Sequence, residues 1–387
     1  MQEPGDFLRI LVIGLGTAGS KIADLIAAPS GRSSRCSGIH ALAVDNDPTI
    51  LDNLSNIERK AKFYFPKDDI SNPELLTTNF TIDEVKAMLR TVDAKGHDAI
   101  LLCAGLGGGL IDLVPHLVQI IRETMFEPVF GLVTMPADEE GEYRLKKAAT
   151  AMHKIRRLLD GVIVFDNNLW LKKAKEQNEA AVQQKNQGIS EIILPSGSPE
   201  KPEFNPYDFI NQTIARRIRL LIQAGEVNEV APQMVLDTRE ILNTIIGMDL
   251  ITIGLSDEPL GERGRLSLFK HKEESIVSRQ NRAGRIVNLA ERAVFRDISA
   301  YCELASARKA LILLSGPEEE LSMKGFMAVR KWIDESIDGF ELRSGDNPIA
   351  SRYASHVSVL ILLSGVRAVQ RVQELDQLVP QSEEKSG

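Results

Sequence analysis

The stretch AILLCAGLGGGLIDL at residues 99–113 most constrains how this chain can fold. Its first half has the pattern of a buried strand and its second half that of an apolar helix, and between them lie Gly105, Gly107, Gly108 and Gly109. At such a junction, bare backbone N–H groups gather at the positive end of a helix and can bind an anion such as phosphate. Glycines also form tight turns that bind nothing, so this stretch alone leaves both interpretations open.

A second junction of the same kind lies near the start of the chain. Residues 8–14 form an apolar run typical of a buried parallel strand, and the helical pattern SKIADLIAA follows. Gly14, Gly16 and Gly19 match G-x-G-x-x-G, whose glycines permit a tight turn, a close approach to phosphate and close packing of helix on strand. A further strand ends at Asp45, whose carboxylate could accept hydrogen bonds from sugar hydroxyls or ordered water, or could cap the following turn.

The order of elements predicts an α/β protein. Apolar strands at PVFGLVTMP and GVIVFDNN alternate with helical patterns, which predicts a parallel sheet with helices on both faces and a ligand at the carboxyl ends of the strands. We expect a helix at 82–91 and a long helix from Pro206 to Gly225. Residues 172–205 are polar and predict an exposed helical extension and loop, and a smaller α+β domain should begin near residue 261.

Composition narrows the class of protein. A hydrophobic fraction of 43% and a charged fraction of 26% are ordinary for a soluble globular protein, and no apolar run is long enough to cross a bilayer. The net charge of -8, without a basic stripe, argues against broad nucleic-acid binding. The N-terminus lacks a secretory-signal pattern, and the three cysteines fit a reducing compartment, so we expect a cytoplasmic protein without a metal-ligand cluster.

Taken in order and at their spacing, these motifs resemble the tubulin/FtsZ superfamily, most closely its archaeal CetZ branch. The resemblance covers nearly the whole chain and is carried by VIGLGTAGSKIAD, AGLGGG, EEGEYRLKKAA, VFDNNLW, PYDFIN, VLDTREILNTI and the repeated LILLSG. It implies a Rossmann-like GTPase domain at 1–205, a central helix with an acidic loop at 206–260, a C-terminal α+β domain at 261–378 and a disordered tail at 379–387.

The resemblance also implies a function. Such a protein would bind GTP or GDP, with magnesium as a companion of the phosphates. It would assemble head to tail with copies of itself into protofilaments and act in cell shape or division. Related tubulin/FtsZ-like proteins would be further partners.

The resemblance assigns candidate site residues one by one, and to these we add Asp45. The expected nucleotide contacts are Gly14, Gly16, Thr17, Ala18 and Gly19 in the first phosphate loop, Gly107, Gly108 and Gly109 in the second, and Asp24, Asp45, Glu142, Asn167, Tyr207 and Asn211 around the base and sugar. Asp24 would bind the guanine edge, Glu142 would reach the ribose and Tyr207 would stack on the base. Asp237 and Glu240 match the acidic pair that reaches the nucleotide of the next subunit and orients the attacking water, which makes hydrolysis follow assembly.

The second glycine loop departs from the family pattern. Family members continue it with Thr-Gly-Ser-Gly, whereas this chain has Leu110, Ile111, Asp112 and Leu113. Both hydroxyls are absent, and Asp112 would bring a negative charge toward a negative ligand. In a site of low dielectric this costs several kcal/mol at about 4 Å unless a cation intervenes or the loop is rearranged. We therefore expect weakened nucleotide binding or slow hydrolysis.

Two alternative functions stay open at this point. The altered loop would suit a pseudo-GTPase that acts as a scaffold or regulator and does not hydrolyse GTP. The pattern G-x-G-x-x-G followed by Asp45 is also the fingerprint of an NAD(P)-dependent oxidoreductase, although no convincing catalytic His or Lys follows a strand.

Overall fold

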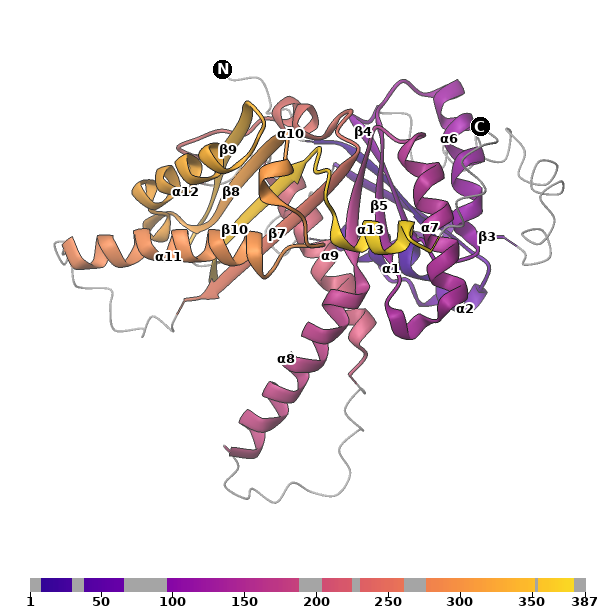
Figure 1. The fold of residues 1–387 in the computed structure, drawn as a ribbon, viewed down its shortest axis with the longest axis horizontal. Helices are drawn as coiled ribbons and strands as arrows, with labels where there is room; N and C mark the ends of the chain where they lie inside the picture. The colour runs from indigo at the N-terminus through magenta and orange to yellow at the C-terminus, as the bar shows by residue number, and fades with distance from the viewer. Residues whose placement is uncertain are drawn as a thin grey trace.

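A computed structural model describes residues 8–29, 38–65, 96–187, 204–224, 230–260, 276–351 and 354–378. One ten-stranded sheet runs through these residues in the order β3-β2-β1-β4-β5-β6-β7-β10-β8-β9, and helices cover it (Figure 1). Among the helices described, none combines the length and the apolar character that a bilayer crossing requires.

The first half of the sheet is entirely parallel, as predicted. The chain steps from β1 to β2 in one direction and from β4 through β5 to β6 in the other. Because parallel crossovers are right-handed, the helices after β1 and β4 lie on opposite faces of the sheet, and a topological switch point lies between these two strands. The elements of this half are β1 (Ile10–Leu15), α1 (Gly16–Ala27), β2 (Ile39–Asp45), α2 (Pro48–Asn53), β3 (Lys62–Tyr64), β4 (Ala99–Gly105), α6 (Val114–Thr124), β5 (Val129–Met135), α7 (Glu142–Arg156), β6 (Gly161–Asp166) and α8 (Asn167–Gln187).

The second half continues the same sheet with a mixed arrangement, in which β10 pairs antiparallel with β7 and β8, and β8 pairs parallel with β9. β7 pairs parallel with β6 at two positions and antiparallel with β10 along its whole length, so it joins the two halves. The expected domain boundary near residue 261 falls just after this joining strand. The elements are α10 (Thr238–Ile245), β7 (Leu250–Pro259), α11 (Ile276–Phe295), β8 (Lys309–Pro317), α12 (Met323–Ser336), β9 (Glu341–Ile349), β10 (His356–Ser364) and α13 (Gln370–Asp376).

The long helix α9 (Pro206–Gln223) lies between the two halves. Asn205 caps it by accepting a hydrogen bond from the Tyr207 N–H, and Pro206 occupies the first turn, where no N–H is needed. Its apolar residues recur every three or four positions and are buried, and the helix packs mainly against α1 and α8 and touches the sheet at β7. The predicted terminator Gly225 lies outside the described residues.

Some sequence expectations differ from the structure or fall outside it. The predicted extension at 172–205 is helical as far as Gln187, where α8 projects beyond the body of the molecule (Figure 1), and the rest lies outside the described residues. The same is true of the predicted helix at 82–91 and the tail at 379–387. Helix α12 begins at Met323, and Ser322 caps it by accepting a hydrogen bond from the Gly325 N–H. Helix α11 lies near the start of the C-terminal region, where the sequence analysis assigned no element.

Candidate functional site

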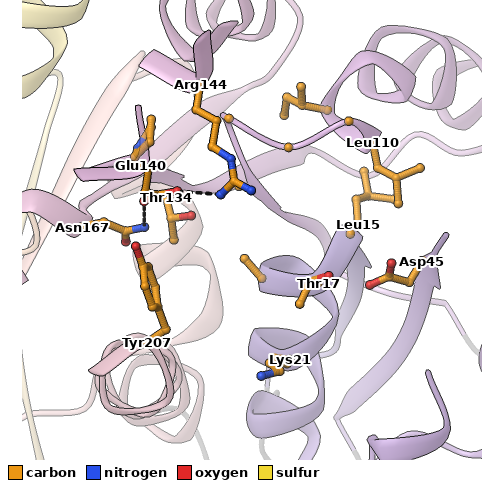
Figure 2. A pocket seen from close by; sticks show the side chains of 18 of the residues that line it. Leu15, Thr17, Lys21, Asp45, Leu110, Thr134, Glu140, Arg144, Asn167 and Tyr207 are labelled. Atoms are coloured by element: carbon orange, nitrogen blue, oxygen red, sulfur yellow. Dashed lines mark hydrogen bonds and ion pairs between the residues drawn. The ribbon is translucent and has the colours of Figure 1, made fainter. Parts of the chain in front are cut away.

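A cavity of about 480 Å³ opens at the carboxyl ends of the parallel strands, beside the switch point, and the start of α9 closes one side (Figure 2). This is the edge of the sheet where the sequence predicted a ligand. The predicted site residues that line the cavity are Gly16, Thr17, Ala18, Asp45, Gly107, Gly108, Gly109, Asn167, Tyr207 and Asn211. Lining residues that the sequence analysis did not assign to nucleotide contact include Lys21, Thr134, Glu140 and Arg144.

Backbone N–H groups dominate one end of the cavity. Helix α1 begins at Gly16 with no side-chain cap, so the N–H groups of its first turn point at the cavity unpaired by any side chain. Gly16 has a φ of +70°, a backbone conformation that suits glycine. Gly107, Gly108 and Gly109 line the same cavity, and Leu110, which follows them, lies beside this helix end (Figure 2). Two glycine loops thus form one anion-binding end of the cavity.

Gly14 and Gly19 do not line the cavity, because they are packed inside the fold. A Cβ on Gly19 would lie 2.0 Å from the carbonyl oxygen of Cys103, and one on Gly14 would lie 2.6 Å from the carbonyl oxygen of Gly19. Gly14 therefore lets α1 pack closely on its own strand β1, and Gly19 lets α1 pack closely on β4, which is the packing role of the motif rather than ligand contact.

The structure places Asp24 away from the cavity. Its buried carboxylate accepts hydrogen bonds from the N–H groups of Asn56 and Ile57 and from the Asn56 side chain, which holds the loop after α2. Lys21, almost one helical turn closer to the start of α1, lines the cavity instead and pairs with Asp208 at 3.3 Å. The predicted contact of Asp24 with guanine has no support from this geometry.

Glu142 also points away from the cavity, and Glu140 of the same loop lines it. The side chain of Glu142 is 75% exposed and pairs with Lys146, which lowers the pKa of Glu142. Glu140 accepts hydrogen bonds from the Ala137 N–H at 2.9 Å and from Asn167 Nδ2 at 3.4 Å. Gly141 separates the two carboxylates with a φ of +95°, so the chain turns between them and only Glu140 faces the cavity.

Aromatic and amide side chains form the other end of the cavity. Tyr207 points toward Glu140 and Asn167 (Figure 2), and burial together with the charge of Glu140 raises the Tyr207 pKa to about 12. Asn211 lies one turn further along α9, on the same face as Tyr207, as the spacing predicted. Asn167 Oδ1 is buried and has no hydrogen-bond partner within the described protein atoms, so it is an acceptor available to a ligand.

Asp45 contributes a second unpartnered acceptor. The residue is fully buried, its Oδ1 accepts a hydrogen bond from the Asp47 N–H at 3.1 Å, and its Oδ2 has no partner among the described residues. Burial raises the pKa of this carboxyl. It lies beside Thr17 at the glycine-rich end of the cavity (Figure 2), and not beside Tyr207.

The altered second loop behaves differently from the expectation. Leu110 and Ile111 do line the cavity, and their buried side chains make its wall apolar. Asp112 does not line it, because its carboxylate turns toward α7 and pairs with Lys147 at 2.7 Å. The Lys147 ammonium is a cation beside this carboxylate, so the repulsion expected between Asp112 and a bound phosphate is offset.

Asp237 and Glu240 lie outside the cavity of their own chain. They cap α10 reciprocally: Asp237 Oδ1 accepts from the Glu240 N–H at 2.7 Å, and Glu240 Oε2 accepts from the Asp237 N–H at 3.3 Å. Arg343 of β9 lies 3.6 Å from Glu240, whose side chain remains 32% exposed. Among the residues described, no group of three or more His, Cys, Asp or Glu is arranged to hold a metal ion.

Two protein families have sequence models that match this chain. The GTPase domain of the tubulin/FtsZ family matches residues 9–175, and the C-terminal domain of tubulin-like CetZ matches residues 204–381. The tubulin-like protein CetZ1 of Haloferax volcanii is 30% identical, over 97% of this chain and 93% of the relative. The tubulin-like protein CetZ of Pyrococcus abyssi is 23% identical, over 95% and 88%.

Solved structures resemble this one over nearly the whole chain. The GDP-bound monomer of Haloferax volcanii CetZ1 superposes with a TM-score of 0.72 at 28% identity, covering 96% of this chain and 98% of that one. The GTPγS-bound protofilament of CetZ2 from the same organism gives 0.70 at 22% identity, covering 96% and 97%. An empty FtsZ dimer of M. jannaschii gives 0.62 at 17%, covering 94% and 89%.

Proposed function

Because this chain belongs to the tubulin/FtsZ family, in its CetZ branch, we propose that it binds GTP and GDP in the cavity between α1 and α9 and assembles head to tail into cytoskeletal filaments. The cavity itself carries the proposal, since two glycine loops form one end and Tyr207, Asn167 and Asn211 form the other. In this proposal residues 1–205 bind the nucleotide, 206–260 act on the neighbouring subunit and 261–378 complete the filament contacts. The role would be in cell shape or division, inside the cytoplasm.

The polar atoms at the Tyr207 end suit guanine. Guanine presents N1–H and N2–H donors on one edge, and the unpartnered Asn167 Oδ1 is an acceptor at that end of the cavity. Tyr207 supplies a flat surface for stacking, and Glu140 is placed to accept from a ribose hydroxyl. Lys21 and Asn211 add donors on the α1 and α9 sides.

The glycine-rich end suits phosphates despite the substitutions in the second loop. The lost hydroxyls leave the N–H groups of both loops in place, and Arg144 reaches the same region of the cavity from α7 (Figure 2). Arg144 pairs with Glu140 at 3.1 Å and remains 57% exposed, so its guanidinium can also bind an anionic oxygen. Binding by backbone and arginine would replace binding by Thr and Ser hydroxyls.

Magnesium fits beside the phosphates. Asp45 Oδ2 is a buried carboxylate oxygen without a partner, at the phosphate end, and magnesium prefers such hard oxygen ligands together with phosphate oxygens. Asp45 and the nucleotide would hold the ion, which would neutralise phosphate charge. An anionic side chain beside an anionic ligand is otherwise unfavourable.

Hydrolysis in this proposal is completed between subunits. Asp237 and Glu240 lie outside the cavity of their own chain, and Glu240 is partly exposed, which permits contact with the nucleotide of a neighbour. Their carboxylates would orient the attacking water. The protofilament form of the similar CetZ2 supports this head-to-tail arrangement.

Calorimetric titration of the purified chain with GTP, GDP, ATP and NAD tests the binding step. We expect micromolar or tighter binding of both guanine nucleotides, and much weaker binding of ATP and NAD. Sedimentation with GTP, measured with phosphate release, then separates a working GTPase from a pseudo-GTPase scaffold, which would pellet without turnover. Preferential binding of NAD, or no binding of guanine nucleotides, would contradict the proposal.

Tyr207→Ala should weaken GDP binding about 10- to 100-fold, because stacking of a base on an aromatic side chain contributes about 1–3 kcal/mol. Tyr207→Phe keeps the ring and loses only the hydroxyl near Glu140, so its effect should be smaller. Tyr143→Ala is the control, since Tyr143 is 79% exposed and does not line the cavity. Equal affinities for all three variants would place the base elsewhere.

Asp45→Asn should stabilise the nucleotide-free protein by about 1 kcal/mol at pH 7, because it removes a buried negative charge whose Oδ2 has no hydrogen-bond partner among the described residues. Burial raises the Asp45 pKa in the folded state, so the wild type loses stability as pH rises from roughly 4, and the advantage of the variant should shrink toward that pH. Urea unfolding at several pH values measures this difference in stability.

The same variant should lose the gain in GTP affinity that magnesium gives. If magnesium raises GTP affinity as much in Asp45→Asn as in the wild type, Asp45 does not hold the ion.

A further inference from the structure

The side chain of Arg371 joins the last described helix to the wall of the nucleotide cavity. Arg371 lies in α13, and its side chain is only 5% exposed. Its Nη2 donates hydrogen bonds to the carbonyl oxygen of Pro136 at 2.7 Å and to Asp138 Oδ1 at 2.8 Å. Its Nη1 donates to Glu374 at 2.9 Å, within α13 itself. Helix α13 crosses the first half of the molecule beside α7 (Figure 1).

The loop that Arg371 binds carries a residue central to the cavity. Residues 136–141 follow β5, Pro136 lines the cavity, and Glu140 holds Asn167 and interacts with Tyr207. The position of Pro136 and Asp138 therefore sets where the Glu140 carboxylate lies. A shift of this loop would move the groups that we assign to the base and ribose together.

Glu140 itself pairs with Arg144 at 3.1 Å, and the contacts of the two residues before it, other than those with Arg371, are weaker. The Asp138 N–H donates to Asn168 Oδ1 at 3.3 Å, and Glu139 pairs with Lys175 at 2.8 Å in a bridge whose two side chains are both 54% exposed. Exposed ion pairs of this kind contribute little, about 0–1 kcal/mol. A charge-assisted bond from a buried guanidinium is stronger, and removing the guanidinium leaves the Pro136 carbonyl without its donor.

Arg371 also lies near a second loop at the cavity, the one that joins β6 to α8. Its Nε lies 3.9 Å from the buried carboxylate of Asp166, at the end of β6 and directly before Asn167. Asp166 Oδ1 accepts the Asn168 N–H at 2.8 Å, in the first turn of α8. The carboxylate near Arg371 therefore also holds the start of that helix. One side chain of α13 thus contacts two of the loops that form the cavity.

From these contacts we propose that Arg371 is a positioning residue for the nucleotide, and that α13 acts as a strap whose docking sets the affinity for the base and ribose. The inference rests on the proposed function, because it assumes that a guanine nucleotide occupies the cavity. Coupling of this kind is reciprocal, so bound nucleotide should also strengthen the docking of α13.

Arg371→Gln is the test variant, and Arg367→Gln is its control, because Arg367 is 72% exposed and pairs only at the surface, with Asp338 at 3.4 Å. We expect Arg371→Gln to weaken GTP and GDP binding by the same factor, about tenfold, since the strap does not touch the terminal phosphate. Unequal losses for the two nucleotides, or no loss, would overturn the proposal. Calorimetry measures both affinities.

A double-mutant cycle with Glu140→Ala separates positioning from general destabilisation. If Arg371 acts through the loop that carries Glu140, the second mutation should add little to the loss of affinity caused by the first. Additive losses would mean that Arg371 acts by another route. Should Arg371→Gln fail to fold, Asp138→Asn replaces it as the test variant. Asp138 is 67% exposed, so the change should not disturb the core, and it removes the charge of one of the two groups in the 136–141 loop that Arg371 contacts.

Hydrogen exchange without nucleotide tests the strap even if the proposed function fails. In Arg371→Gln the amides of residues 136–145 should exchange faster than in the wild type and in Arg367→Gln. Unchanged exchange would mean that Arg371 does not hold this loop in place. In the wild type, saturating GDP should slow exchange in residues 370–376. If the wild type does not bind guanine nucleotides but the loop exchanges faster in the variant, the proposed ligand is wrong. The conclusion that Arg371 holds the 136–141 loop would then remain.

Discussion

Gly19→Ala is expected to destabilise the fold by about 3 kcal/mol or more, at the upper end of the cost of overpacking a core. A Cβ at this position would lie 2.0 Å from the carbonyl oxygen of Cys103 and 2.8 Å from the carbonyl carbon. Both atoms belong to the backbone of β4, which is buried in the sheet, so no side-chain rotation can relieve the clash. The helix must move away from the strand, and its N-terminus, which lines the cavity, must move with it.

Chemical unfolding followed by circular dichroism measures this effect. Gly284→Ala is the matched control, because Gly284 lies in the middle of α11 and a Cβ there meets no atom within 4 Å. The control should be neutral or more stable, by up to about 1 kcal/mol, since alanine favours a helix more than glycine does. Equal stability of Gly19→Ala and wild type would mean that α1 does not pack on β4 as closely as described.

Glu240→Gln is expected to lower GTP turnover by about 100-fold or more while leaving nucleotide affinity unchanged. A carboxylate that orients and deprotonates a water contributes about 100- to 10,000-fold, and an amide cannot accept the proton. Glutamine keeps an oxygen that can accept the Asp237 N–H, so the cap of α10 and the stability of the fold should survive. Phosphate release, measured at a concentration where the wild type assembles, checks turnover, and Glu142→Gln is the surface control.

Mixing two inactive variants tests whether Glu240 acts on a neighbour. The first is Glu240→Gln, which keeps its cavity, and the second carries Gly108→Asp, which places a carboxylate among the N–H groups of the second loop and keeps Glu240. If Glu240 acts in trans, the mixture should recover turnover, because an intact Glu240 then faces an intact cavity. A mixture as inactive as its components, under conditions where both co-sediment, would contradict action between subunits.

Much of the fold was predictable because its signals are local. A buried apolar run followed by glycines and a helical pattern predicts strand, turn and helix from backbone sterics alone, and β1, β4 and the helices after them follow that pattern. The spacing of Tyr207 and Asn211 placed them on one face of α9 in the same way. Helix α11 carries the same kind of local signal, because its buried residues Ile286, Leu289, Ala290 and Ala293 recur at helical spacing, and the sequence analysis did not use it.

The site was less predictable wherever the direction of a side chain mattered. The sequence offers several carboxylates around Gly141, and the positive φ of that glycine decided that Glu140 faces the cavity and Glu142 faces solvent. Asp112 lies in a phosphate loop by sequence, but Lys147 on the neighbouring helix α7 turns it away. Asp24 matched a base contact, yet the N–H groups of a distant loop hold its carboxylate.

The sequence by itself determined the family, the parallel order of the first half and the position of both glycine loops, because these depend on residues that are neighbours along the chain. Only the tertiary structure decided which charges meet. Arg371 binds the carbonyl of Pro136 across a separation of 235 residues, and Arg343 reaches Glu240 from another strand. Such contacts depend on how whole elements pack, since a long side chain pairs with whatever polar atom the packing brings within reach.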